Sequence, residues 1–209
     1  MKSINRYISK IISDNALYHR EDVKKFIEMN SENLSLTELS RIAELVNNGR
    51  VETSAYYTDE TVLEEIYKYL PEINKEEIRV LEPSVGVGNF LQLIIDKYSN
   101  AKKLIIEVND IDEKSLELLK LLNKYRKIPK NVEIIYHNED YLGQLNSFST
   151  EKFDLVIGNP PFSKVNKQSG LEIYSSLFDD KYSRNLASFF IQKSIFLGEH
   201  VVMVMPKYF

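Results

Sequence analysis

Apolar side chains recur every three to four positions through the first 50 residues, which is the spacing of one helix face. The clearest expected helix follows Ser35, which forms a capping box with Glu38, and it ends at Gly49. Two earlier helices are expected around these apolar sets: Ile4, Tyr7, Ile8, Ile11 and Ile12, then Val23, Phe26 and Ile27. We expect residues 1–50 to form a small helical segment packed on the rest of the chain, with partner binding as the alternative.

The pattern changes after Arg50 to short apolar runs that alternate with helical stretches. The sequence predicts strands at 78–81, 104–108, 132–136, 153–157 and 201–205, and helices at 58–70, 90–98, 113–124 and 186–197. This alternation is typical of a parallel sheet covered on both faces. Such sheets bind ligands at the carboxyl ends of their strands, so we expect the chemistry just after each strand.

The composition is that of a folded globular protein, with 43% apolar and 28% charged residues. With 0 Cys, disulfides, Cys-ligated zinc and thiolate nucleophiles are excluded. The net charge of -4 argues against a dedicated nucleic-acid-binding module but allows a catalytic domain with a local basic groove. No apolar run reaches membrane-spanning length and the first residues lack a signal-peptide pattern, so a cytoplasmic protein is expected.

A glycine turn follows the first predicted strand. The segment reads Leu81-Glu82-Pro83-Ser84-Val85-Gly86-Val87-Gly88-Asn89-Phe90 and holds two of the 7 glycines of the chain. Such a turn lets backbone amides approach a ligand, and tight packing of the strand against its helix is the alternative. A carboxylate at Glu82 repels a pyrophosphate but suits a ligand with an ammonium group, such as S-adenosylmethionine.

Acidic residues follow the next two strands. Asp110 lies 22 positions after Gly88, close to the offset at which similar folds bind ribose hydroxyls, and Ile111 is placed to flank an adenine ring. Asp112 is expected to cap the next helix. After the third strand, Asp140 is a candidate acceptor for the cofactor's adenine amino group, with Tyr141 against the ring.

The turn after the fourth strand has the most specific chemistry. It reads Asn159-Pro160-Pro161-Phe162, and its two prolines stiffen the backbone and remove donors. The turn therefore presents acceptors, the Asn159 side-chain oxygen and the Pro160 carbonyl, followed by the aromatic face of Phe162. These groups suit a planar ring with an exocyclic amine, whereas the alternative is a rigid turn that merely ends a strand.

Together these segments resemble the S-adenosylmethionine-dependent DNA adenine methyltransferases. The resemblance runs from Thr53-Ser54-Ala55-Tyr56-Tyr57-Thr58 to Phe209. Asn159 follows Gly88 by only 71 positions, which leaves no room for a recognition domain between them and resembles the gamma group. The resemblance implies a Rossmann-like α/β methyltransferase domain over 51–209 with a parallel twisted sheet, preceded by the helical segment 1–50.

The family's site residues carry over position by position, and none of them is a metal ligand. The resemblance implies a cofactor site, a pocket for an adenine rotated out of the duplex, and a DNA-contacting loop. The cofactor site would comprise Tyr56, Thr58, Glu82, Pro83, Gly86, Gly88, Asp110, Ile111, Asp140 and Tyr141. The adenine pocket would comprise Asn159, Pro160, Pro161 and Phe162. The DNA-contacting loop would comprise Lys164, Lys167 and Lys181.

The sequence departs from the family pattern at its end. It stops at Pro206-Lys207-Tyr208-Phe209, just past the fifth predicted strand, where the family continues with closing strands and a recognition domain. We therefore expect a fragment of a longer enzyme that meets double-stranded DNA through a later recognition domain or a separate subunit, in a restriction-modification or related system with a possible restriction endonuclease partner.

Three other functions use similar parts. The same turn chemistry serves methylation of a protein glutamine amide or of a guanine amine in RNA. A subunit that binds the cofactor and positions a partner without catalysing transfer is the third alternative.

Overall fold

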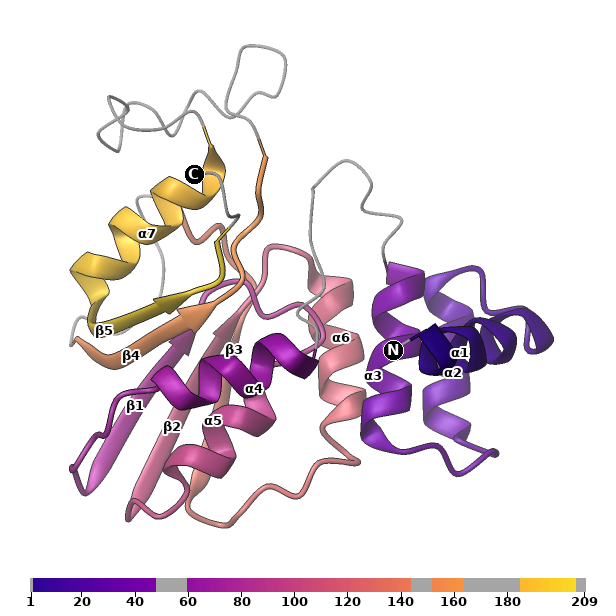
Figure 1. Ribbon diagram of the computed structural model, residues 1–209, viewed down its shortest axis with the longest axis horizontal. Helices are drawn as coiled ribbons and strands as arrows, with labels where there is room; N and C mark the ends of the chain where they lie inside the picture. Colours follow the sequence, from indigo (N-terminus) through magenta and orange to yellow (C-terminus); the bar gives the residue numbers. More distant parts are fainter. Residues whose placement is uncertain (1, 48–59, 144–151, 164–184, 206–209) are drawn as a thin grey trace.

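The computed structural model describes residues 2–47, 60–143, 152–163 and 185–205. At its centre lies a sheet of five strands, all parallel, in the order β3-β2-β1-β4-β5 (Figure 1). The parallel sheet predicted from the alternating pattern is confirmed. The strands are β1 (Glu77–Glu82), β2 (Lys103–Asn109), β3 (Val132–His137), β4 (Phe153–Gly158) and β5 (Gly198–Met203).

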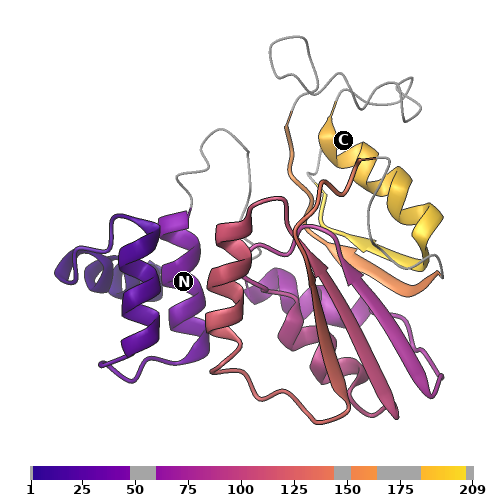
Figure 2. The same ribbon diagram turned by 180° about the vertical axis from the view of Figure 1, so that it is seen from behind.

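The strand order reverses between β1 and β4. From β1 the chain moves outward to β2 and β3, and then returns to the other side of β1 to place β4 and β5. In sheets of this kind, ligands bind outside the carboxyl ends of the strands at such a reversal. Figure 2 shows the carboxyl ends of the strands gathered at one edge of the sheet. That edge is where the predicted site residues of β1 and β4 meet.

Helices cover both faces of the sheet. Apolar residues of α4 (Glu60–Tyr69), α5 (Leu91–Tyr98) and α6 (Glu113–Leu122) pack in one cluster with Val80, Leu104 and Leu155. On the other face, α7 (Leu186–Leu197) packs on Leu81 and Val156. No helix in the described part of the chain is long and apolar enough to cross a membrane.

The three N-terminal helices form a layer beside α6 (Figure 1). They are α1 (Lys2–Asp14), α2 (Arg20–Met29) and α3 (Leu36–Asn47). The predicted capping box is confirmed, because the Ser35 backbone N–H donates to Glu38 at 2.8 Å and the Glu38 N–H donates to the Ser35 hydroxyl at 3.3 Å. Their apolar cluster does not end at α3, since Leu118, Leu121 and Leu122 of α6 and Val87 of the glycine turn belong to it.

The element bounds follow the sequence pattern closely, with one displacement. Helix α7 covers the predicted range 186–197, whereas β5 covers Gly198–Met203 instead of 201–205. The strand starts early because Gly198 already pairs with Phe153 of β4. The first residues of the strand, Gly198, Glu199 and His200, are not apolar, so an apolar pattern could not reveal them.

Candidate functional site

The turns after β1 and β4 lie against each other at the reversal of the sheet. The Ser84 hydroxyl donates to the Asn159 carbonyl at 3.2 Å. A Cβ added at Gly158 would come within 3.4 Å of the Pro83 ring, so the two turns are in close contact. The cofactor and target-base segments predicted from the sequence are therefore neighbours in space.

The glycine turn depends on its two glycines in different ways. Both have positive φ, +55° at Gly86 and +82° at Gly88, a region that residues with a Cβ rarely adopt. A Cβ at Gly86 would meet nothing within 4 Å, whereas one at Gly88 would lie 2.4 Å from Leu119 of α6. Gly86 thus borders open space that a ligand can enter, while Gly88 allows tight packing of the turn on α6.

Replacing Gly88 by alanine should lower the free energy of unfolding by about 2 kcal/mol, because positive-φ strain and overpacking against Leu119 add. Urea denaturation followed by circular dichroism measures the change. Gly86→Ala is the matched control, because it keeps the φ strain without the clash. A Gly88 variant no less stable than the Gly86 variant would contradict this account of the turn.

Glu82, at the end of β1, is a buried carboxyl beside the turn. Its side chain is 1% exposed, and Oε2 accepts no hydrogen bond from the described residues. Burial raises the pKa of Glu82 well above its ordinary value; nearby Arg126 lowers this pKa and Asp110 raises it further. A buried carboxyl with unused acceptor capacity is a suitable partner for a cationic group on a ligand.

Arg126 is a buried residue in contact with the glycine turn that the sequence did not reveal. It donates from Nη2 to the Gly88 carbonyl at 3.2 Å, and its other nitrogens donate to Gln92 and Asn123. Burial lowers the pKa of Arg126, and the nearby Glu82 carboxyl raises it. In the sequence, Arg126 stands in a run of charged residues that looks like a solvated surface.

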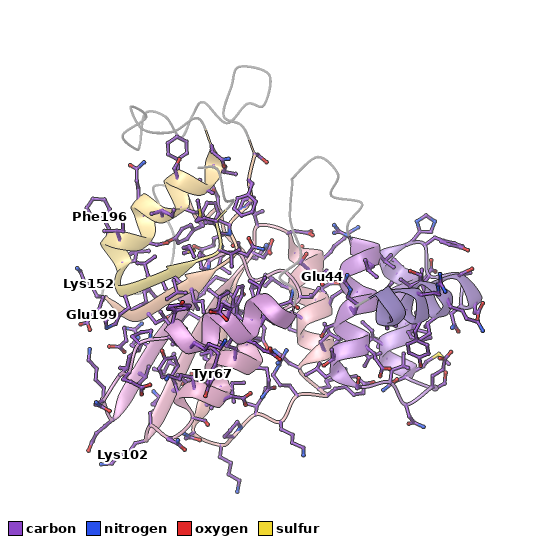
Figure 3. The ribbon with its side chains drawn as sticks, in the orientation of Figure 1. Glu44, Tyr67, Lys102, Lys152, Phe196 and Glu199 are labelled. Carbon is purple, nitrogen blue, oxygen red and sulfur yellow. The ribbon has the colours of Figure 1, made fainter. Side chains whose placement is uncertain are left out.

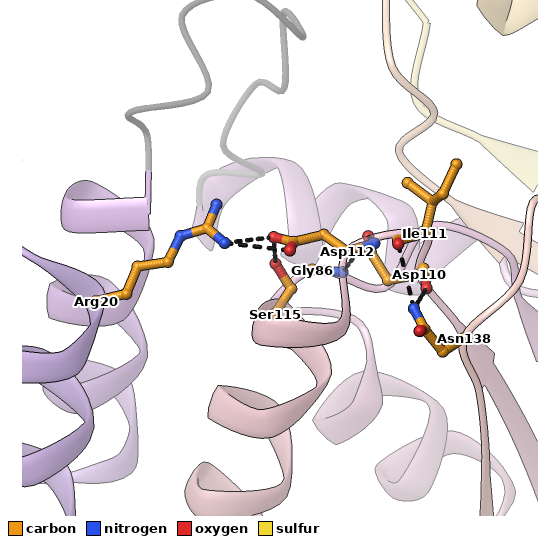
Figure 4. Close-up of polar contacts among 7 residues, drawn as sticks. All are labelled: Arg20, Gly86, Asp110, Ile111, Asp112, Ser115 and Asn138. Atoms are coloured by element: carbon orange, nitrogen blue, oxygen red, sulfur yellow. Dashed lines mark hydrogen bonds and ion pairs between the residues drawn. The ribbon is translucent and has the colours of Figure 1, made fainter.

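Asp110 joins the segment after β2 to the glycine turn (Figure 4). One carboxylate oxygen accepts from the Gly86 N–H at 2.8 Å, and the other accepts from the Asp112 N–H at 2.9 Å. Asn138 donates to the carbonyls of Asp110 and Ile111. Ile111 is 69% exposed at this edge of the sheet, where an adenine ring could cover it.

Asn109 ties three strand ends together and was also missed. Its side-chain N–H donates to the carbonyls of Pro83 and Glu139, and its oxygen accepts from the Glu139 N–H, each at 3.1 Å. Nothing in its sequence context distinguishes it from a loop asparagine. It fixes the spacing of the segments that follow β1, β2 and β3.

The two residues predicted after β3 have different surroundings. Asp140 is half-buried, and its carboxylate accepts from the Leu142 N–H at 3.0 Å. Tyr141 is buried in the core, with its ring 4.9 Å from that of Phe190 and its hydroxyl 2.9 Å from that of Ser194. This packing differs from the predicted position of Tyr141 against an adenine ring, because the apolar ring is held between the sheet and α7.

The turn after β4 holds the predicted target-base residues in one short segment. Pro160 is buried, and Asn159, Pro161 and Phe162 are half-buried. The Asn159 side-chain oxygen Oδ1 is itself buried. The segment ends where the Ser163 carbonyl accepts from the first N–H of α7, at Leu186, at 2.8 Å.

The described residues do not include five of the predicted site residues, which are Tyr56, Thr58, Lys164, Lys167 and Lys181. No metal-binding group occurs within the residues that are described.

The comparisons with known proteins agree on one class. The chain matches the family model described as Eco57I restriction-modification methylase over residues 26–209. The Type II methyltransferase M.CvrRI of Paramecium bursaria Chlorella virus XZ-6E is 32% identical over 114 residues, which are 54% of this chain and 25% of that protein. A protein of Methanocaldococcus jannaschii named as a methyltransferase is 30% identical over 115 residues, 53% of this chain and 41% of that protein. The matches span less than half of either relative.

Two solved structures share the fold. A protein from Listeria monocytogenes, assigned to the class I S-adenosylmethionine-dependent methyltransferases, covers 99% of this chain and 75% of its own with a TM-score of 0.64 and 12% identity. The methyltransferase subunit of a type I restriction-modification system from Streptococcus thermophilus has a TM-score of 0.54 at 14% identity, over 79% of this chain and 38% of that one. At these identities the likeness establishes the fold.

Proposed function

Because the chain belongs to the Eco57I restriction-modification methylase family, we propose that it transfers the methyl group of S-adenosylmethionine to DNA. The proposed acceptor is the exocyclic N6 amine of adenine in double-stranded DNA. The observation that carries the proposal is the contact between the turn 159–162 and the glycine turn, joined by the hydrogen bond from Ser84 to Asn159. This contact supports the proposal because the predicted amine acceptors then adjoin the predicted cofactor segment, as direct transfer between two bound groups requires.

The residues of the glycine turn fit S-adenosylmethionine. Gly86 borders open space, and Glu82 keeps a buried oxygen that a cationic group would satisfy. The cofactor residues of this proposal are Glu82, Pro83, Gly86, Gly88, Asp110, Ile111 and Asp140, together with Tyr56 and Thr58 outside the described residues. When bound, S-adenosylmethionine would supply a methyl group on a cationic sulfur. The amine nitrogen would bond to the methyl carbon as the carbon–sulfur bond breaks, which leaves a neutral thioether, and the nitrogen would release one proton to solvent.

The turn after β4 makes the amine reactive. An exocyclic amine is a poor nucleophile because its lone pair is delocalised into the ring. The Asn159 side-chain oxygen and the Pro160 carbonyl accept hydrogen bonds from its two N–H groups and stabilise the positive charge that develops on nitrogen. Phe162 stacks on the base, which offsets part of the few kcal/mol needed to rotate it out of the duplex.

DNA is the proposed macromolecular partner. Recognition of its sequence belongs to a further domain or a separate subunit, and a restriction endonuclease reads the same sites. The relatives are named a Type II methyltransferase and a methyltransferase subunit of a type I system, which supports this context.

Sequencing of modified bases in cells tests the substrate. Genomic DNA from a strain that lacks adenine methylation and expresses the gene should contain N6-methyladenine in one sequence context, while the same strain with the Asn159→Ala gene should contain none. RNA and protein from these cells serve as parallel substrates. Methyl groups on guanine in RNA or on glutamine side chains, with none on DNA, would overturn the assignment of adenine.

A further inference from the structure

The N-terminal helical segment contacts the glycine turn after β1 and the segment 110–112 after β2 at three separate points. These two segments are called the two cofactor turns below. Val87, between the two glycines, is 4% exposed and packs in the apolar cluster of α1–α3. Asn89, just after Gly88, donates to Glu44 of α3 at 3.0 Å. Asp112, in the segment after β2, pairs with Arg20 of α2. An apolar contact, a hydrogen bond and an ion pair therefore all converge on the two turns.

The Arg20 contact continues directly to the glycine turn. Arg20 Nη1 lies 2.8 Å and 3.1 Å from the two carboxylate oxygens of Asp112 (Figure 4). The Asp112 carboxylate also accepts from the Ser115 hydroxyl at 2.8 Å, while its backbone N–H donates to Asp110, which in turn accepts from Gly86. Although Asp112 stands at the predicted cap position of α6, its carboxylate caps no backbone N–H. It is used to connect α2 to the turns.

The Glu44 contact is made in a setting where a carboxylate is costly. Glu44 lies on α3 where this helix meets the sheet domain (Figure 3), and its side chain is 13% exposed. Among the described residues, its carboxylate accepts from the neutral Asn89 side chain and, at 3.4 Å, from Nη1 of Arg41 on its own helix. Burial outweighs both contacts and raises the pKa of Glu44 to about 7. A buried acid with so little compensation suggests a role other than stability.

We propose that the N-terminal helical segment holds the two cofactor turns in their binding geometry, with Arg20 and Glu44 as positioning residues. A turn with two glycines is free to adopt many conformations, and a ligand that has to order it binds more weakly. Contacts with a packed helical layer order the turn in advance. This inference rests on the proposed cofactor site and assigns the helical segment a part in it.

Arg20→Met tests the ion pair. Its dissociation constant for S-adenosylmethionine, measured by titration calorimetry, should rise about tenfold, because one turn loses its anchor; tenfold corresponds to the loss of about one charge-assisted hydrogen bond. Lys24→Met is the matched control, since Lys24 pairs with Glu117 across the same two helices, away from both turns. Its dissociation constant should stay within about twofold of the wild-type value.

Replacements of Glu44 separate positioning from stability. Glu44→Gln keeps an oxygen that accepts from Asn89, while Glu44→Leu has none. The folded protein holds Glu44 in its protonated form up to about pH 7, whereas the unfolded chain ionises it near its ordinary pKa of 4.5. Burial of Glu44 therefore lowers the stability of the fold progressively between these two pH values, and the full loss is present at pH 8, where both variants should unfold at a temperature no lower than the wild type. At pH 8 the dissociation constant should rise about tenfold for the leucine variant and by less for the glutamine variant, whose neutral oxygen is a weaker acceptor than a carboxylate.

The pH dependence gives a readout that a purely structural role would not change. As the pH falls from 8 to 6, Glu44 takes up a proton and becomes a weaker acceptor for Asn89, so wild-type affinity for S-adenosylmethionine should fall. Glu82 and Asp110 are common to both proteins, so the difference between wild type and Glu44→Gln isolates the contribution of Glu44. The glutamine variant should show the smaller change.

The outcomes distinguish this inference from the proposed function. A wild-type chain that does not bind S-adenosylmethionine would contradict the cofactor site itself. A wild-type chain that binds it, with Arg20→Met and Glu44→Leu binding equally well, would overturn the positioning role alone. Affinities that simply follow unfolding temperatures across all four variants would also overturn it.

Discussion

Asn159→Ala should reduce methyl transfer about 100- to 1000-fold while leaving affinity for S-adenosylmethionine within about twofold, since removal of one preorganised polar group from a transition-state site has effects of that size. The Asn159 oxygen is needed only when the amine reacts. Because Asn159 lies in the turn after β4 and not in the glycine turn, its loss should leave S-adenosylmethionine binding unchanged. The rate of methyl transfer is measured with radiolabelled S-adenosylmethionine and DNA, using the purified protein that was expressed in the cell experiment. Calorimetry with the same purified protein gives its affinity for S-adenosylmethionine.

Asn159→Asp is the informative companion variant. Aspartate keeps a side-chain oxygen that accepts from the amine, so it should retain measurable transfer where alanine does not. An alanine variant that transfers methyl groups at the wild-type rate would show that Asn159 does not act as the acceptor. Equal losses for alanine and aspartate would mean that the amide N–H, rather than the oxygen, matters.

Asp110→Ala should have the opposite effect, weakening S-adenosylmethionine binding by about 100-fold, or about 3 kcal/mol, through the loss of two charge-assisted hydrogen bonds. The Gly86 and Asp112 N–H groups would lose their common acceptor, so the glycine turn would have to be ordered by the ligand. Any bond from Asp110 to the ribose of the cofactor would be lost as well. Calorimetry measures the affinity, and circular dichroism verifies the fold.

Glu113→Ala is the matched control for Asp110. Glu113 is an exposed acid three positions further along, at the start of α6, so its loss removes the same charge without disturbing the turn. Its affinity should match the wild type. If Asp110→Ala binds as tightly as Glu113→Ala, Asp110 has no part in holding the turn or the cofactor.

Local patterns were enough to predict most of the fold. The apolar period and the Ser35 box placed the N-terminal helices, and α7 was predicted to the residue. Short, mostly apolar runs such as 153–157 predicted the buried strands, and all six residues of β4 are buried. β5 was displaced because its start is fixed by pairing with β4 rather than by its own apolar residues.

The sequence was less informative about the site, for a physical reason. Residues next to a glycine or proline turn, such as Glu82 and Asn159, could be proposed as site residues because the turn itself is distinctive. Arg126 and Asn109 act on segments that are distant in the sequence, and nothing local marks an arginine or asparagine that will be buried. Tyr141 illustrates the reverse error, because an aromatic ring after a strand can pack into the core as readily as onto a ligand.

The shared apolar cluster of α1–α3, α6 and Val87 has a practical consequence for protein production. The sequence suggests a cut near residue 50, yet a chain shortened there would expose Val87, Leu118, Leu121 and Leu122, all buried in the intact protein. Apolar surface of this kind promotes self-association. Expression of the sheet domain without its first three helices should therefore give insoluble material, and purified samples should be designed to begin ahead of α1.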